Sequence, residues 1–169
     1  MKIYEQPLKI ITDIISTKMK LDSGRVMLYN QNYNIPNDDA IFIIVNEEDS
    51  SVFATSTTTR LNENGEYEEV NDALIRCTVT VDVLSAGEEA RERKHEVILA
   101  LNSIYSQQMQ EANHVKIANI PNNFLNTSSA EASQMLNRYT ISFGLIYKKT
   151  VTDLVEYYDT FNTQIGTNK

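Results

Sequence analysis

The sequence has no tryptophan and a single cysteine, Cys77, among its 169 residues. One cysteine cannot form a disulfide within the chain, and it excludes a zinc site built from several cysteines. Cys77 lies in an alternating apolar run, so we expect it to be a buried structural thiol. Tyrosine is comparatively frequent, with nine residues, and its apolar ring with a polar tip suits surfaces that a partner later covers.

Basic charge and long apolar runs are also scarce. The chain has 15 Lys and Arg against 23 Asp and Glu, which gives a net charge of −8. A protein that grips nucleic acid needs a basic surface, so we expect no tight DNA or RNA binding. No apolar run reaches the length of a membrane span, and the N-terminus lacks the apolar core of a signal peptide. We therefore expect synthesis in a cytoplasm-like compartment and no membrane contact.

Patterns that carry catalysis are missing as well. His95 and His114 have no further His or Cys at ligand spacing, and the sequence contains no Gly-rich phosphate loop or nucleophile elbow. We therefore expect no catalytic residues, no metal site and no cofactor, and a protein that is not an enzyme. A remote alternative stays open: a small α+β enzyme or ligand-binding protein with a pocket lined by Tyr29, Tyr33 and nearby carboxylates.

Two segments are predicted to be helical. The first is Pro7–Leu21, where proline occupies the first helical position. Its apolar residues form a stripe wider than one contact face: Leu8, Ile10, Ile11, Ile14, Ile15, Met19 and Leu21. The second runs from a capping box at Ser85–Glu88 to about Gln110, and its apolar face includes Ile104. Glu89 and Arg93 have the spacing of an i,i+4 ion pair.

Five segments are predicted to be strands: Val26–Leu28, Ala40–Val45, Leu74–Leu84, Val115–Ile120 and Arg138–Tyr147. In the third, apolar residues alternate with polar ones, among them Asp82, which we expect to face solvent or to cap a turn. Pro121–Ser133 is predicted to be a loop. The order of elements predicts one α+β domain, 1–169, in which two principal helices pack on one face of a mainly antiparallel sheet.

A long β-hairpin is predicted at Ser51–Val70, with Asn64–Gly65 forming a type I′ turn. Four of the five residues Ser56–Arg60 carry hydroxyl groups, so this ribbon has little to bury. We expect the hairpin to be a continuation of two strands of the sheet beyond the body of the domain. An unpaired edge of this length is an aggregation hazard in a monomer and an asset in an assembly that adds a neighbouring strand.

Three segments together resemble phage tail terminator and neck proteins. Thr78–Ser103 is similar to the family's strand, short turn and amphipathic helix. Val26–Asn46 is similar to its strand, Asn-rich loop with a proline, and buried strand. Arg138–Val151 is similar to the later strand that pairs back, and the order along the chain is the same. The long Ser51–Val70 hairpin and the long Asn119–Ser133 loop depart from the family pattern.

The resemblance implies a ring, expected to be a hexamer, at the top of a contractile or non-contractile phage tail. Such a ring caps the tail tube, stops its polymerisation and joins it to the head connector. The implied partners are further copies of the chain, the tube protein, the head-completion or connector protein, and the sheath protein if the tail contracts. Genomic DNA would pass through the lumen without specific binding. The protein would reside in the virion neck after assembly in the host cytoplasm. The alternative within this class is another neck adaptor or the tube protein itself.

A subunit or tube contact is the role expected for the hairpin and for an aromatic cluster near the C-terminus. A flexible tail is expected from about residue 162. The candidate interface residues are Thr55, Thr57, Thr59, Arg60, Asn64, Glu66, Glu68, Tyr157, Tyr158 and Phe161.

Overall fold

The computed structural model of the protein describes residues 6–22, 24–29, 38–131 and 134–155. The helices are α1 (Pro7–Met19), α2 (Glu89–Leu101) and α3 (Ile104–Ala112). The strands are β1 (Val26–Leu28), β2 (Phe42–Leu61), β3 (Tyr67–Ser85), β4 (Val115–Ala118), β5 (Leu125–Asn126), β6 (Ser129–Glu131) and β7 (Gln134–Leu154).

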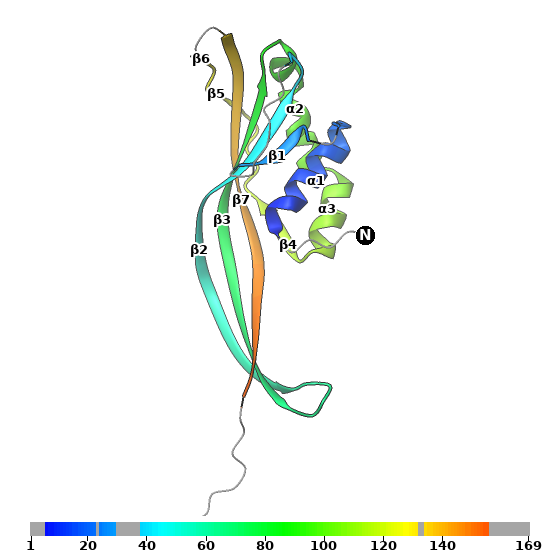
Figure 1. Cartoon of the computed structure of the whole chain (residues 1–169), viewed down its shortest axis with the longest axis vertical. Coiled ribbons are helices and arrows are strands. Elements are labelled where there is room, and N and C mark those ends of the chain that lie inside the picture. Colours follow the sequence, from blue (N-terminus) through cyan, green and yellow to red (C-terminus); the bar gives the residue numbers. More distant parts are fainter. Residues whose placement is uncertain (1–5, 23, 30–37, 132–133, 156–169) are drawn as a thin grey trace, which may run out of the picture.

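The strands form a mostly antiparallel sheet in the order β1-β2-β3-β7-β4, with β5 and β6 also pairing with β7. β1 is parallel to β2, and the other pairs are antiparallel. All three helices cover one face of the sheet at one end of the molecule (Figure 1). The predicted α+β class is therefore confirmed.

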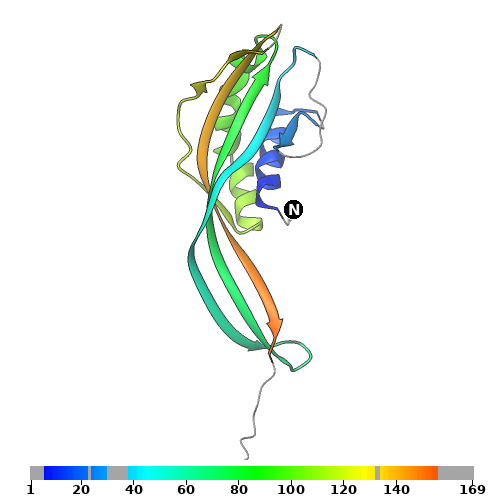
Figure 2. The ribbon, with the colours of Figure 1, turned by 60° about the vertical axis from the view of Figure 1, so that its left-hand side comes forward.

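Three strands continue far beyond the helical layer, as Figure 2 shows. We call this extension the arm: residues 51–61 of β2, 67–76 of β3 and 148–154 of β7, with the turn 62–66 at its tip. The remaining described residues form the body. Consecutive strand residues rise about 3.3 Å each, so the arm reaches about 35 Å from the body.

The core of the body lies between the helices and the sheet. Ile11, Ile14 and Ile15 of α1 are fully buried. They pack in one cluster with the inward face of β3, which includes the buried Cys77, and with residues of α2 and α3. The wide apolar stripe of α1 is thus used inside the domain and is not a spare surface. A smaller cluster of Met27, Phe42 and Leu84 lies apart from this main core.

The prediction of one long second helix is wrong, because the chain breaks between α2 and α3. Ser103 caps the second piece: its Oγ accepts the Ser106 N–H at 3.1 Å. A serine at this position is a preferred N-cap, because its hydroxyl accepts one of the backbone N–H groups that have no partner within the helix. The break turns Ile104 outward, where 73% of its surface is exposed, so its predicted burial is wrong.

The predicted capping box at the start of α2 is also wrong. The Ser85 hydroxyl accepts the Ala90 N–H at 2.9 Å and donates to the Gly87 carbonyl at 2.6 Å. Glu88 makes no side-chain cap, and Glu89 accepts the Ile41 N–H at 2.8 Å. These bonds tie the turn to the start of β2, which local spacing does not reveal.

Two further predictions in the body need correction. Arg93 pairs with Glu96 at 2.9 Å, and not with Glu89. The expected loop 121–133 contains the short strands β5 and β6, which pair with β7.

Candidate protein interface

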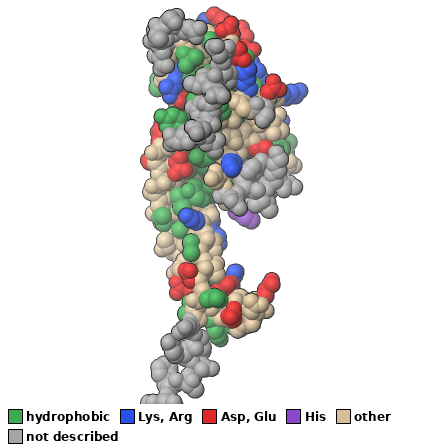
Figure 3. Space-filling model, in the orientation of Figure 1, with side chains coloured by type: hydrophobic (Ala, Val, Ile, Leu, Met, Phe, Trp, Pro, Cys, Tyr) green, Lys and Arg blue, Asp and Glu red, His purple; other side chains and the backbone are tan. Residues whose placement is uncertain are grey.

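The arm is the candidate interface because its three strands extend from the body and bury very little: among the residues of the arm, only Val70 is buried. Every residue of β2 from Ser51 to Leu61 is exposed. On the face of the arm that Figure 3 shows, backbone and uncharged polar side chains cover most of the surface, with some hydrophobic side chains between them and acidic side chains near the tip. Threonine suits such a ribbon, because its branched side chain favours strand geometry while its hydroxyl remains hydrated.

The turn at the tip differs from the predicted type I′ turn. Gly65 has a positive φ of 79°, whereas Asn64 is not among the residues with positive φ. The Gly65 N–H donates to the Asn62 carbonyl at 3.0 Å, and the Asn62 N–H donates to the Glu66 carbonyl at 2.9 Å. This is a β-turn followed by a left-handed glycine, the three-residue hairpin loop. The Asn62 side chain stabilises it by accepting the Asn64 and Glu66 N–H groups.

The predicted interface residues of the hairpin divide between two faces and the tip. Thr55, Thr57 and Thr59 lie directly opposite Ala73, Asn71 and Glu69, so they share the face that continues into the helix-covered side of the body. Arg60 and Glu68 lie opposite each other on the other face, and Asn64 and Glu66 lie in the turn. Tyr157, Tyr158, Phe161 and the tail from 162 lie outside the described residues.

Polar cross-strand contacts hold the arm together. Arg60 Nε donates to Glu68 Oε1 at 2.5 Å, and Thr57 Oγ1 donates to Asn71 Oδ1 at 2.7 Å. Asp72 accepts from Lys148 Nζ at 2.8 Å and from Thr150 Oγ1 at 2.6 Å. The hydrogen bond from Lys148 is the main cause that holds the pKa of the Asp72 carboxyl below its ordinary value. Contacts of this kind fix register with little apolar burial.

The third strand of the arm is longer than the sequence pattern predicted, because the expected strand ended at Tyr147. β7 continues to Leu154 in unbroken register with β3, and Leu154 lies opposite Glu68. The signal was present in the alternation of Thr150, Val151 and Thr152, which has high strand propensity. Exposed apolar side chains on the arm were also missed: Val52, Phe53, Leu61, Tyr67, Leu74, Val151 and Leu154.

Both long edges of the arm are open. β1 pairs with β2 only as far as Val45, and β4 pairs with β7 only as far as Tyr147. Among the described residues, no strand therefore lies beside the outer edge of β2 or of β7 in the arm. β2 carries register shifts at Glu47/Asp49 and Val52/Ala54, near the base of the arm. Such bulges bend and twist an edge strand and reduce unwanted pairing there.

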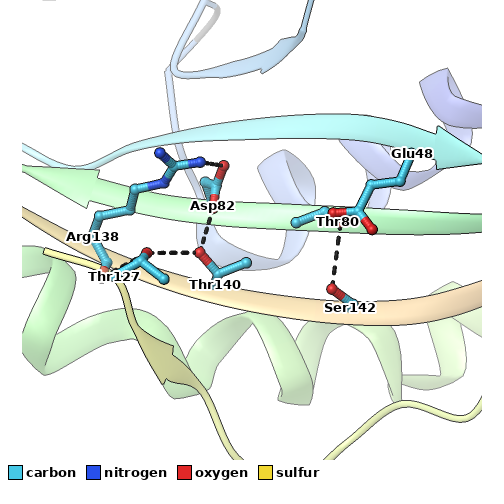
Figure 4. A network of polar contacts seen from close by, with 7 residues as sticks. All are labelled: Glu48, Thr80, Asp82, Thr127, Arg138, Thr140 and Ser142. Atoms are coloured by element: carbon cyan, nitrogen blue, oxygen red, sulfur yellow. Dashed lines mark hydrogen bonds and ion pairs between the residues drawn. The ribbon is translucent and has the colours of Figure 1, made fainter.

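A polar network stiffens the sheet between the arm and the far end of the body (Figure 4). Asp82 accepts from Arg138 at 2.6 Å and from Thr140 at 2.5 Å, and Thr80 donates to Glu48 at 2.5 Å. The Asp82 residue is only 6% exposed, so the expectation of a solvent-side or capping residue is wrong. Its partners come from another strand, which is why local sequence did not indicate its burial.

Two hollows mark the ends of the arm. One of ≈ 570 Å³ lies at the tip between Arg60, Asn62, Glu63, Asn64 and Glu68. The other, of ≈ 260 Å³, lies at the elbow where arm and body meet, and it is lined by Gln6, Pro7, Ile10, Asn113, Val115, Tyr147, Lys148 and Lys149.

Among the residues that the structure describes, no group of three or more His, Cys, Asp or Glu side chains could hold a metal ion. Within the same residues, no helix is long and apolar enough to cross a membrane. Tyr33, part of the alternative ligand pocket, lies outside the described residues.

The sequence matches no protein-family model, and a search among curated proteins gives no significant match.

Proposed function

We propose that the protein is a phage tail terminator: a structural protein of the virion neck that forms a ring, caps the tail tube and joins it to the head connector. The observation that carries this proposal is the arm, which extends from a well-packed body with both outer edges open. An isolated domain gains little from such an extension, because open edges invite aggregation. An assembly gains a surface on which neighbours can dock.

A closed ring of identical subunits needs two different surfaces on each subunit that meet head to tail. The Thr-rich β2 strand, with Thr55, Thr57 and Thr59 exposed, supplies one such surface for a neighbouring subunit or the tube. The net charge of −8 fits a ring through which DNA passes, because acidic walls repel phosphates over about 8–10 Å at physiological salt.

The proposal is tested by shortening the arm. Ala54 and Leu74 lie directly opposite each other, so Thr55–Ala73 can be replaced by Asn-Gly to close a short hairpin. We expect the unmodified protein to form uniform rings with a central hole in negative-stain images. The shortened variant should stay folded by circular dichroism and give no rings in light scattering and images.

The matched control replaces Gln107 and Gln108, two exposed residues of α3, by alanine and should form normal rings. A monomeric unmodified protein, or normal rings from the shortened variant, would contradict the proposal. Purified rings should also stop polymerisation of the tube protein from the same virus.

A second candidate, the tube protein itself or another neck adaptor, is favoured by the same open edges, which also allow open-ended stacking. Sedimentation separates the two, because a terminator gives one discrete species whereas a tube protein gives a polymer whose length grows with concentration.

A further inference from the structure

The outer edge of β7 between Lys148 and Leu154 is a pairing-competent strand. It begins where β4 stops at Val115, opposite Tyr147, and it lies below the helical layer in Figure 1. β7 has no register shift against β3 along this segment. It contains no proline and no glycine, so nothing in its backbone prevents a further strand from hydrogen-bonding to it.

The side chains on this edge are complementary to a second copy of themselves. When two such edges run antiparallel and are centred on Val151, Val151 faces its counterpart and Lys149 faces Asp153 of the other copy. Lys149, Val151 and Asp153 share one face of the strand, and all three are exposed. Among the residues that the structure describes, neither Lys149 nor Asp153 has an ion-pair partner.

We propose that two copies of the chain dimerise through this edge, in an antiparallel two-fold contact centred on Val151 that joins both arms into one sheet. The two-fold axis repeats every favourable pair: Lys149 with Asp153 twice, and Thr150 with Thr152 twice. Opposite charges and β-branched residues placed directly across an antiparallel ladder are favourable pairs. The dimer is independent of the ring, so it goes beyond the proposed function.

Pairing of the β7 edge with the β2 edge of a neighbour would not bring opposite charges face to face. With two arms side by side and parallel, Lys149, Val151 and Asp153 lie level with Thr55, Thr57 and Thr59. No ion pair forms in that arrangement. The charge pattern therefore favours the antiparallel contact of β7 with β7.

The hollow at the elbow gives the end of the partner strand a place to lie. In the antiparallel register, Leu154 of the other copy lies opposite Lys148, at the end of the open edge. Val115 of β4 already pairs with Tyr147, so Val155 of the other copy leaves the ladder there, beside the hollow. Tyr147 and Lys148 line the hollow together with Pro7, Ile10 and Val115. Val155 is 41% exposed in the single chain, so the contact covers an apolar side chain as well as the open edge.

Cysteine cross-linking tests the register. In a Cys77→Ala background, Val151→Cys should give a disulfide-linked dimer under mild oxidation, because directly opposed residues have Cα atoms about 4.5–5.5 Å apart. Lys149→Cys alone should not cross-link, whereas its mixture with Asp153→Cys should. Cross-linking in a mixture of Thr57→Cys with Val151→Cys, without a Val151→Cys homodimer, would overturn the proposal in favour of head-to-tail pairing.

Charge reversal tests the chemistry of the contact. Lys149→Asp should weaken dimerisation about tenfold or more in sedimentation at low salt, because two attractive pairs become repulsive. The double variant Lys149→Asp/Asp153→Lys restores the complementary pattern and should restore the dimer. Failure of the double variant to recover, or no effect of the single one, would contradict the proposal. Rings scored by electron microscopy in the same samples report on the proposed function separately.

Discussion

The body and the arm are built from the same strands but are stabilised differently. In the body, the inward face of β3 consists of Cys77, Val79, Val81 and Val83, none more than 1% exposed. In the arm, the same face of the same strand carries Tyr67, Glu69, Asn71 and Ala73, and none of them is buried. One continuous strand therefore passes from a hydrophobic core into a ribbon that is held mainly by hydrogen bonds and ion pairs.

This difference assigns the stability of the fold to the body and the contacts with other proteins to the arm. A fully buried aliphatic side chain contributes roughly 1.5–3 kcal/mol, whereas an exposed cross-strand pair contributes roughly 0.2–1 kcal/mol. The body should therefore determine whether the chain folds, and the arm should determine what the folded chain contacts. Variants and pH changes that act on one region only test that division.

The largest effect is expected from a cavity in the body. Ile14→Ala removes a fully buried side chain of α1 and should lower the free energy of unfolding by about 2–5 kcal/mol. The control Leu99→Ala, at a position 70% exposed, should change it by less than about 0.5 kcal/mol. Urea unfolding followed by circular dichroism measures both, and equal effects would contradict the packing described for α1.

Two cross-strand ion pairs give a direct comparison of body and arm. Asp82→Ala should cost about 2–3 kcal/mol, because the Asp82 side chain is only 9% exposed and the change removes the carboxylate that accepts from Arg138 and Thr140. Arg60→Ala in the arm should cost less than about 1 kcal/mol, because the Arg60 side chain is 64% exposed. Urea unfolding measures both free energies, and a larger loss of stability for Arg60→Ala than for Asp82→Ala would contradict this comparison.

Alkaline pH should affect the body through Cys77. Burial raises the pKa of the Cys77 thiol to about 11, above its ordinary value of 9.0. The folded state therefore holds the proton more tightly, so this contribution to stability is complete below pH 9 and is lost as pH rises through about 11. Cys77→Val should show a smaller fall in stability between pH 9 and 11, and an identical fall in both proteins would contradict the assignment.

Protonation of Asp72 at acidic pH should have the smallest effect, because this carboxyl lies in the arm and holds no core residue. Because the folded pKa of Asp72 is lowered by its bond from Lys148, its contribution is present above the ordinary value of 3.8 and is lost as pH falls through the folded pKa. Amide exchange of Asn71 and Thr150 should then speed up relative to the amides of the body. Asp72→Asn should remove this pH dependence, and a uniform response of arm and body would contradict a local role.

The sequence predicted those parts of the fold that rest on periodicity. The stripe of α1 and the alternation around Cys77 and Ile141 indicated the core correctly, because apolar spacing directly reflects which side is buried. The break between α2 and α3 and the bond of Ser85 to Ala90 were not predicted, because they depend on tertiary contacts that local spacing does not contain.

Of the three strands that form the candidate interface, the sequence predicted the two strands of the hairpin. The Thr-rich β2 strand and the Asn64–Gly65 turn located the hairpin, although the turn has a different geometry. The β7 strand of the arm was missed, because its end lies next to no core and its pairing with β3 is a contact between residues far apart in sequence. The burial of Asp82 was missed for the same reason: Arg138 and Thr140 reach it from β7.

Hydrogen exchange measured on assembled and on dissociated protein tests directly whether the arm is the assembly surface. We expect assembly to slow exchange in residues 51–61 and 148–154, while the amides of Val79–Val83 in the body core exchange equally slowly in both states. Unchanged exchange in the arm, with new protection confined to the outer surface of α2 and α3, would contradict it.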